Sequence, residues 1–186
     1  MVFAGSANAA TLTFDLPYGE IPSPYIENGF SFASPPSLFS WGPGASSPYG
    51  ADPSTSSATL LANYKQAVKM TAVSGGPFTL TRMDLADTYN SGLVDDVEFL
   101  FTFADNTTLS SLATLDSTPG LQPVTFLLSN LISAEWTVTS GNFGPQVDNL
   151  VADVSGVPVP AALPLFVSAF AAFGLIGWKR RGLATS

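Results

Sequence analysis

Short apolar runs, separated by turn residues, fill most of this 186-residue chain. From Phe78 to Leu85 polar and apolar side chains alternate, which is typical of a β-strand with one buried face. From Val97 to Phe103 every second residue is Val or Phe, while Leu100 falls on the other face. No stretch of useful length before Pro160 has the period of a helix. The pattern therefore predicts an all-β fold for everything upstream of that proline.

Ten segments fit strands by composition and by the turn residues on either side of them. They are Thr11–Asp15, Gly29–Ala33, Ala58–Ala62, Gln66–Val73, Phe78–Ala86, Asp96–Ala104, Thr107–Leu112, Pro123–Leu128, Ala134–Thr139 and Asp148–Val154. Ten short strands in one domain predict a β-sandwich of two sheets. The stretch from Pro35 to Ser57 is rich in Pro, Gly and Ser, so we expect a long ordered loop or a strand-poor excursion there.

The alternation also predicts which side chains turn inward. The expected core residues are Met70, Phe78, Leu80, Phe99, Phe101, Phe103, Phe126, Leu128, Trp136, Val138, Leu150 and Val154. Between two predicted strands, Asp105-Asn106 indicates a hairpin turn, since Asp and Asn favour turn conformations.

The composition excludes several kinds of chemistry. The chain has no histidine and no cysteine, which excludes a Ser-His-Asp triad, a cysteine nucleophile and a zinc site of His or Cys ligands. All fourteen acidic residues precede Val154, where only Lys65, Lys69 and Arg82 oppose them, so this part carries a net charge of −11. A nucleic-acid partner is not expected, because phosphate binding needs a basic face. A glycosidase needs two flanking carboxylates, but no sequence pattern pairs the candidates, and we expect no enzyme. These candidates are Asp84, Asp87, Asp95, Asp96, Glu98 and Glu135.

The C-terminal segment has the properties of a membrane anchor. No ionisable side chain occurs between Ala161 and Trp178. As a helix rising about 1.5 Å per residue, this segment would span roughly 27 Å, against a hydrocarbon core of about 30 Å. Pro164 is tolerated in the first helical turn, so we predict a single transmembrane helix over 163–178. A buried helix of a soluble core is the alternative, but such a helix is normally polar on one face. Three cations follow at once and favour a cytoplasmic C-terminus: Lys179, Arg180 and Arg181.

A short proline-containing box precedes this helix. Its residues are Val157, Pro158, Val159, Pro160 and Ala161. The box, the apolar helix and the basic cluster occur in the order found in the PEP-CTERM class of bacterial sorting signals, and residues 157–186 resemble its VPLPA-type variant. The resemblance implies that a membrane enzyme, an exosortase, cuts near the box after export and passes the protein to the cell envelope.

The first nine residues fit the end of a secretory signal. Ala7 and Ala9 flank Asn8 in the small-x-small pattern that precedes a signal cleavage site. We expect residues 1–9 to be the remnant of a signal peptide and residues 10–156 to be the exported domain; an ordinary N-terminus is the alternative. The expected route is export, an intermediate anchored in the inner membrane, and then the cell envelope or the extracellular space.

Three short motifs resemble the exported jelly-roll domains of the same class, which are similar to carbohydrate-binding modules. They are Thr13-Phe14-Asp15, Pro77-Phe78-Thr79-Leu80 and Val147-Asp148-Asn149-Leu150. The resemblance implies a jelly-roll-like sandwich and a structural calcium between the first and last strands, with Asp15 and Asp148 as ligands. The alternative is that Asp148 and Asn149 satisfy local backbone groups. No other cofactor is expected.

The functional hypothesis follows from both ends of the chain. We expect an anchored and sorted protein of the bacterial envelope or extracellular matrix, with a structural or interaction role. Its expected partners are the membrane and an exosortase-type enzyme. The alternative is a module that binds carbohydrate, such as an exopolysaccharide, by stacking sugar rings on Trp41 and Tyr49.

Overall fold

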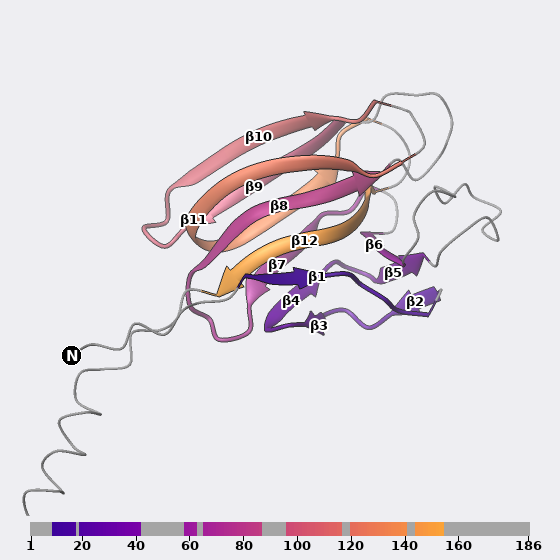
Figure 1. Ribbon diagram of the computed structural model, residues 1–186, viewed down its shortest axis with the longest axis horizontal. Helices are drawn as coiled ribbons and strands as arrows, with labels where there is room; N and C mark the ends of the chain where they lie inside the picture. Colours follow the sequence, from indigo (N-terminus) through magenta and orange to yellow (C-terminus); the bar gives the residue numbers. More distant parts are fainter. Residues whose placement is uncertain are drawn as a thin grey trace, which may run out of the picture. The chain divides into compact units, whose positions relative to one another are not determined.

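The described part of the chain consists of β-strands and connecting turns, and contains no helix (Figure 1). The computed structural model describes residues 9–17, 19–41, 58–62, 65–86, 96–116, 120–140 and 144–154. All of these residues lie in the compact unit Met1–Ser155. The prediction of an all-β fold is confirmed for them.

Twelve strands follow one another along the chain. They are β1 (Ala10–Leu12), β2 (Gly19–Ile21), β3 (Tyr25–Glu27), β4 (Phe30–Ala33), β5 (Leu38–Trp41), β6 (Thr59–Ala62), β7 (Val68–Ala72), β8 (Phe78–Ala86), β9 (Asp96–Phe103), β10 (Thr108–Thr114), β11 (Gln122–Val138) and β12 (Gln146–Val154). Figure 1 shows β8, β11 and β12 running alongside one another, with the short strands β1 to β5 gathered below β12 in this view.

All strand pairs are antiparallel and form one continuous sheet. Its main order is β2-β5-β6-β12-β8-β11-β7-β4-β3, with β1 beside β12, β9 beside β11 and β10 beside β9. Two separate sheets were expected, and the continuity arises from β11. The first half of this 17-residue strand pairs with β8, and its second half lies between β7 and β9. Leu127 and Asn130 have positive φ angles where the register shifts, so the strand bends instead of ending.

The sheet folds over one large hydrophobic core, and Leu61 and Phe39 form a small separate cluster. Phe30 of β4 and Phe78 of β8 are not neighbours in the sheet, yet their ring centroids are 5.5 Å apart in an edge-to-face arrangement. Most of the expected core side chains are fully buried, because they occupy the inward positions of the alternating strands. Four are only partly buried, at the margin of the core: Phe103, Phe126, Leu128 and Val154.

The stretch from Pro35 to Ser57 was predicted to be a long ordered loop or a strand-poor excursion, and the loop prediction was wrong for its first part, which contains a strand. Residues Leu38–Trp41 form β5, which pairs with β2 on one side and β6 on the other. Leu38 is fully buried, so its contact with the core stabilises a strand that the surrounding Pro, Gly and Ser residues obscured. Residues 42–57 lie outside the described residues.

The predicted hairpin at Asp105-Asn106 is confirmed between β9 and β10. Asn106 has a φ angle of 65°, which Asn adopts at lower cost than most residues. The Asp105 carboxylate accepts hydrogen bonds from the Thr107 backbone N–H at 2.9 Å and from the Thr107 hydroxyl at 2.7 Å. These bonds favour the ionised form and lower the pKa of Asp105.

The predictions for the C-terminal segment concern residues that the structure does not describe. The proline box at 157–161, the helix over 163–178 and the basic cluster at 179–181 all lie outside the described residues. Within the described residues, no helix is long and apolar enough to cross a membrane.

Candidate functional site

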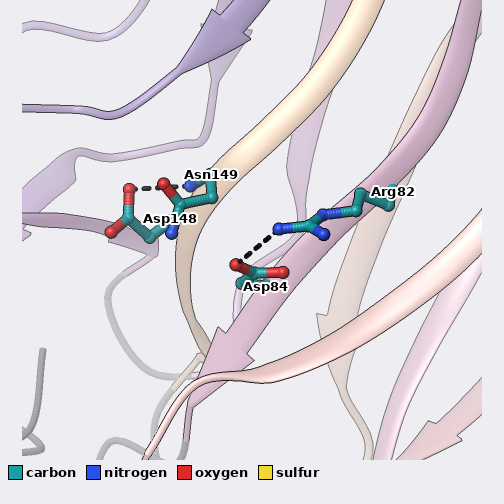
Figure 2. A network of polar contacts seen from close by, with 4 residues as sticks. All are labelled: Arg82, Asp84, Asp148 and Asn149. Atoms are coloured by element: carbon teal, nitrogen blue, oxygen red, sulfur yellow. Dashed lines mark hydrogen bonds and ion pairs between the residues drawn. The ribbon is translucent and has the colours of Figure 1, made fainter.

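Two buried aspartates occupy paired positions on neighbouring strands near the middle of the sheet. Asp84 of β8 lies directly opposite Asp148 of β12 in the antiparallel ladder (Figure 2). Next to Asp148, Asn149 has a φ angle of 46°, and the register shifts between Asp148 and Val151. Asn149 is therefore the extra residue of a β-bulge, which re-aims the side chains beside it.

Both carboxylates are withdrawn from water. The relative exposure of Asp148 is 0% and that of Asp84 is 7%. Arg82 donates from Nη2 to Oδ2 of Asp84 at 3.2 Å, while the second oxygen of Asp84, Oδ1, is buried without a hydrogen-bond partner. Asp148 accepts a hydrogen bond from the Asn149 backbone N–H at 2.7 Å. Figure 2 shows these two contacts as separate pairs on adjacent strands.

This arrangement places two buried acidic residues at paired positions of the ladder. Like charges at paired positions destabilise a β-sheet, and the buried Oδ1 of Asp84, which has no hydrogen-bond partner, loses its hydration energy. The guanidinium of Arg82 offsets part of this cost for Asp84. The Asp148 carboxylate accepts a hydrogen bond from a local backbone N–H, that of Asn149, as the alternative to calcium binding predicts for Asp148.

Sequence reasoning found only part of this group. Asp84 was one of six unpaired carboxylate candidates and Asp148 was a candidate calcium ligand, but Arg82 received no role. The two-residue spacing of Arg82 and Asp84 on an alternating strand was the available signal, because such residues share a face. The pairing of Asp84 with Asp148 had no signal, since it depends on the register between strands that are distant in sequence.

Asp15 belongs to a different polar cluster, just after β1. The Thr13 hydroxyl donates to Oδ2 of Asp15 at 2.9 Å, and the Thr13 backbone N–H donates to Oε1 of Glu27 at 3.1 Å. The Tyr25 hydroxyl donates to the other oxygen of Glu27 at 2.9 Å. Burial, the hydrogen bond to Glu27 and the charges of Glu27 and Asp15 together raise the pKa of Tyr25 to about 12.

The β1–β12 ladder ends with Leu12 opposite Leu150, so the segments that carry Asp15 and Asp148 leave it side by side. Asp15 is solvent-exposed, whereas Asp148 is fully buried. Calcium requires six to eight oxygen ligands. Within the described residues, no group of three or more Asp, Glu, His or Cys side chains lies close enough together to hold a metal ion.

A shallow groove crosses the outer face of β9 and β11. Its volume is about 170 Å³, and it is lined by Glu98, Leu100, Glu135, Trp136 and Thr137. Leu100 is opposite Glu135 and Glu98 is opposite Thr137, so the two carboxylates stand diagonally across the strand pair. Glu98 and Glu135 were among the carboxylate candidates, but no sequence pattern predicted that they would lie near each other.

The remaining predicted site residues are placed as follows. Ala9 is exposed just before β1, and Trp41 is the last residue of β5, although its side chain lies outside the description. The other predicted residues lie outside the described residues altogether: Ala7, Tyr49, Val157, Pro158, Val159, Pro160, Ala161, Lys179, Arg180 and Arg181.

Comparison with known proteins adds no assignment: no protein-family model matches this chain, and no curated protein is similar enough to it to show a family.

Proposed function

We propose that this chain is an exported protein of the bacterial cell envelope or extracellular matrix. It is anchored and sorted by its C-terminal segment, which resembles a PEP-CTERM signal, and its role is structural or interactive and not catalytic. The anchored form is an intermediate in the inner membrane, from which an exosortase-type enzyme releases the protein near Val157–Ala161.

One observation carries this proposal. Eighteen residues without an ionisable side chain, from Ala161 to Trp178, are followed at once by three cations. Each unpaired polar or charged group that enters hydrocarbon costs free energy, so an uncharged segment of this length fits a bilayer. The cations remain on the cytoplasmic side, which leaves the acidic domain outside.

The test follows the full chain in a bacterium that has an exosortase. Cytoplasmic, membrane and surface fractions are separated, and the protein is detected in each. We expect a full-length membrane form and a shorter surface form. An intact protein confined to the cytoplasm would rule the proposal out.

A matched pair of variants separates a stop signal from a simple charge effect. Arg180→Gln with Arg181→Gln removes two positive charges beside the apolar segment, and we expect loss of the anchored form. Lys65→Gln with Lys69→Gln makes the same change in net charge at exposed positions of the domain. This control should be sorted like the natural protein.

The second candidate function is carbohydrate binding by a calcium-stabilised, jelly-roll-like domain whose folded sheet forms the two layers of a sandwich. The groove over β9 and β11 favours it. Glu98 and Glu135 can accept hydrogen bonds from sugar hydroxyls, Thr137 can also donate, and Leu100 supplies an apolar surface. A volume of about 170 Å³ lies below that of sites for drug-sized ligands, so it suits one sugar ring.

Titration of the full chain with exopolysaccharide distinguishes two binding faces. Weaker binding by Glu135→Gln would place the sugar in the groove, and weaker binding by Trp41→Ala would place it on the aromatic residues near β5. Glu20→Gln, an exposed carboxylate change on β2, is the control. The natural protein's failure to bind would end this candidate.

Calcium is tested separately by thermal unfolding in calcium and in a chelator. A higher midpoint in calcium that disappears in Asp148→Asn supports the ion. Equal midpoints in both buffers count against it.

A further inference from the structure

Strand β10 forms a long open edge of the sheet. Among the described strands it pairs only with β9, and all but one of its seven residues are exposed. Its sequence, Thr-Leu-Ser-Ser-Leu-Ala-Thr, contains no charge, proline or glycine. Natural proteins usually protect such an edge with a charge, a proline, a bulge or a very short strand, because free backbone groups bind other strands.

The other open edges in the described residues are protected in these ways. β1, β2 and β3 are three residues long each. The first half of β11 has an open side, but it is interrupted by Pro123 and by the positive φ angles of Leu127 and Asn130. Of the described strands, only β10 offers a regular edge that a long strand could use.

The hairpin shows which backbone groups of β10 are free. The Phe103 N–H donates to the Thr107 carbonyl at 2.9 Å, which makes Phe103 and Thr107 a hydrogen-bonded pair. Hydrogen-bonded and non-hydrogen-bonded pairs alternate along an antiparallel ladder. Counting from Thr107, the backbone groups of alternate residues are directed away from β9. These residues are Thr108, Ser110, Leu112 and Thr114. The Thr114 carbonyl is not free, because it accepts a hydrogen bond from Nε2 of Gln122 at 3.2 Å.

We propose that this edge binds the β10 strand of a second copy of the chain, and that the two strands pair antiparallel about Ser111. In this register Thr108 lies opposite the Thr114 of the second copy, and Ser110 lies opposite its Leu112. The Ser110–Leu112 pairs each exchange two hydrogen bonds through their free groups. The Thr114 carbonyl can accept the Thr108 N–H of the second copy in addition to its bond from Gln122, because a carbonyl oxygen has two lone pairs. A two-fold axis through the Ser111 pair closes both edges at once, so the assembly stops at two copies.

A second copy fits this edge better than an unrelated strand for two reasons. It brings an equally long and regular edge whose own free groups need partners. The symmetric register also places no charge opposite another charge along the strand, although the domain as a whole is strongly acidic. Leu109 and Leu112, which are 43% and 60% exposed on opposite faces of β10, each gain a cross-strand neighbour.

The chain has no cysteine, so single introduced cysteines report this pairing cleanly. In the full chain, kept in a mild detergent, Ser111→Cys should form an intermolecular disulfide under gentle oxidation. The expected Cα separation of a non-hydrogen-bonded pair, about 4.5 Å, lies within the range for a disulfide. Ser129→Cys is the matched control, exposed on β11 and outside the β10 edge, in the stretch interrupted by the positive φ angles of Leu127 and Asn130. Both variants, Ser111→Cys and Ser129→Cys, retain the apolar C-terminal segment, so any association through that segment affects their cross-linking equally. We expect at least tenfold faster cross-linking of Ser111→Cys.

Mixing tests the register. Leu109→Cys and Ala113→Cys should cross-link to each other, and each should do so slowly alone. Ser110→Pro removes an outward N–H without breaking a bond to β9, so in the Ser111→Cys background it should slow cross-linking to the control rate. Unchanged tryptophan emission would show that this variant still folds. The proposal is wrong if Ser111→Cys joins no faster than Ser129→Cys. Equal cross-linking of the mixed and single proteins, or no effect of Ser110→Pro, would also overturn it.

Discussion

Removal of the Arg82 side chain should show how much the pairing of Asp84 with Asp148 in the ladder lowers the free energy of unfolding. Arg82→Ala deletes the cation that contacts Oδ2 of Asp84 at 3.2 Å and leaves Asp84 without a cation at the position paired with Asp148. Asp84→Asn instead removes one of the two negative charges. The two variants break the same ion pair, but they leave opposite electrostatic situations behind.

The burial of the two partners sets the magnitude. Removing one partner of a fully buried ion pair costs about 3–5 kcal/mol, whereas an exposed pair contributes about 0.2–1 kcal/mol. The side chain of Asp84 is 10% exposed and that of Arg82 is 45% exposed, so solvent screens one end of this pair. We therefore expect Arg82→Ala to lower the free energy of unfolding by about 2 kcal/mol. Asp84→Asn should lower it by less than about 1 kcal/mol, because relief of the like-charge contact offsets the lost ion pair.

Urea unfolding of the full chain in mild detergent, followed by the emission of the buried Trp136, measures both values. For a domain of this size, with a slope of about 2 kcal/mol per molar, a loss of about 2 kcal/mol moves the midpoint by about 1 M. Lys65→Ala, which removes an exposed cation before β7, is the control and should leave the midpoint unchanged.

Two results would refute this reasoning. If Arg82→Ala unfolds at the midpoint of the natural protein, the ion pair does not stabilise the fold. If Asp84→Asn is as unstable as Arg82→Ala, then removing the negative charge of Asp84 opposite Asp148 does not stabilise the fold. The double variant adds a check, since it should be about as stable as Asp84→Asn alone.

Three further predictions test the packing and the turns. Ultraviolet titration should find Tyr25 ionising near pH 12 instead of near 10, and Glu27→Gln should lower that value. The pKa of Tyr25 is higher in the folded state than in the unfolded chain, so neutral Tyr25 stabilises the folded state fully below pH 10. This stabilisation is lost as the pH rises to about 12. A double-mutant cycle of Phe30→Leu and Phe78→Leu should give a coupling of about 0.5–1.5 kcal/mol in urea unfolding, and no coupling would contradict the folded-over sheet. Asp105→Ala should speed hydrogen exchange of the Thr107 backbone amide, which donates to the Asp105 carboxylate. In the natural protein the ionised carboxylate protects this amide from exchange. Because the pKa of Asp105 is lowered, the protection is complete above the ordinary pKa of Asp and is lost as the pH falls through the lowered pKa.

Local pattern predicted the long strands closely. The ends of β8 matched the prediction, and β9 ended one residue earlier than expected. In these strands the burial of alternate residues supplies enough free energy to be visible in the sequence itself. The hairpin after β9 was predictable for a similar reason, since Asp105 and Asn106 form the turn through their own side chains.

The short strands could not be predicted in this way. β2, β3 and β5 have three or four residues each, which is too few for a period to show. They are strands because a neighbour lies within hydrogen-bonding distance. The strand β11 posed the reverse problem: two segments were predicted, separated by a break near Asn130, but the chain bends there without leaving the sheet.

The candidate site shows the same division. The sequence marked Asp84, Asp148, Glu98 and Glu135 as carboxylates on strands, and an alternating strand places Arg82 and Asp84 on one face. It contained no information on which strands would be neighbours. The opposition of Asp84 and Asp148, and the groove between Glu98 and Glu135, therefore came only from the folded sheet.

By itself the sequence determined the all-β class, the inward side chains of the long strands, the absence of histidine and cysteine chemistry, and the acidic charge of the domain. These properties depend on composition or on residues that are close along the chain. The tertiary structure alone decided that β11 joins both halves of one sheet, that Asp84 is paired with Asp148 in the ladder, and that β10 has an open edge among the described strands. These features depend on the register between strands separated by many residues, and register is chosen by the packing of the whole core.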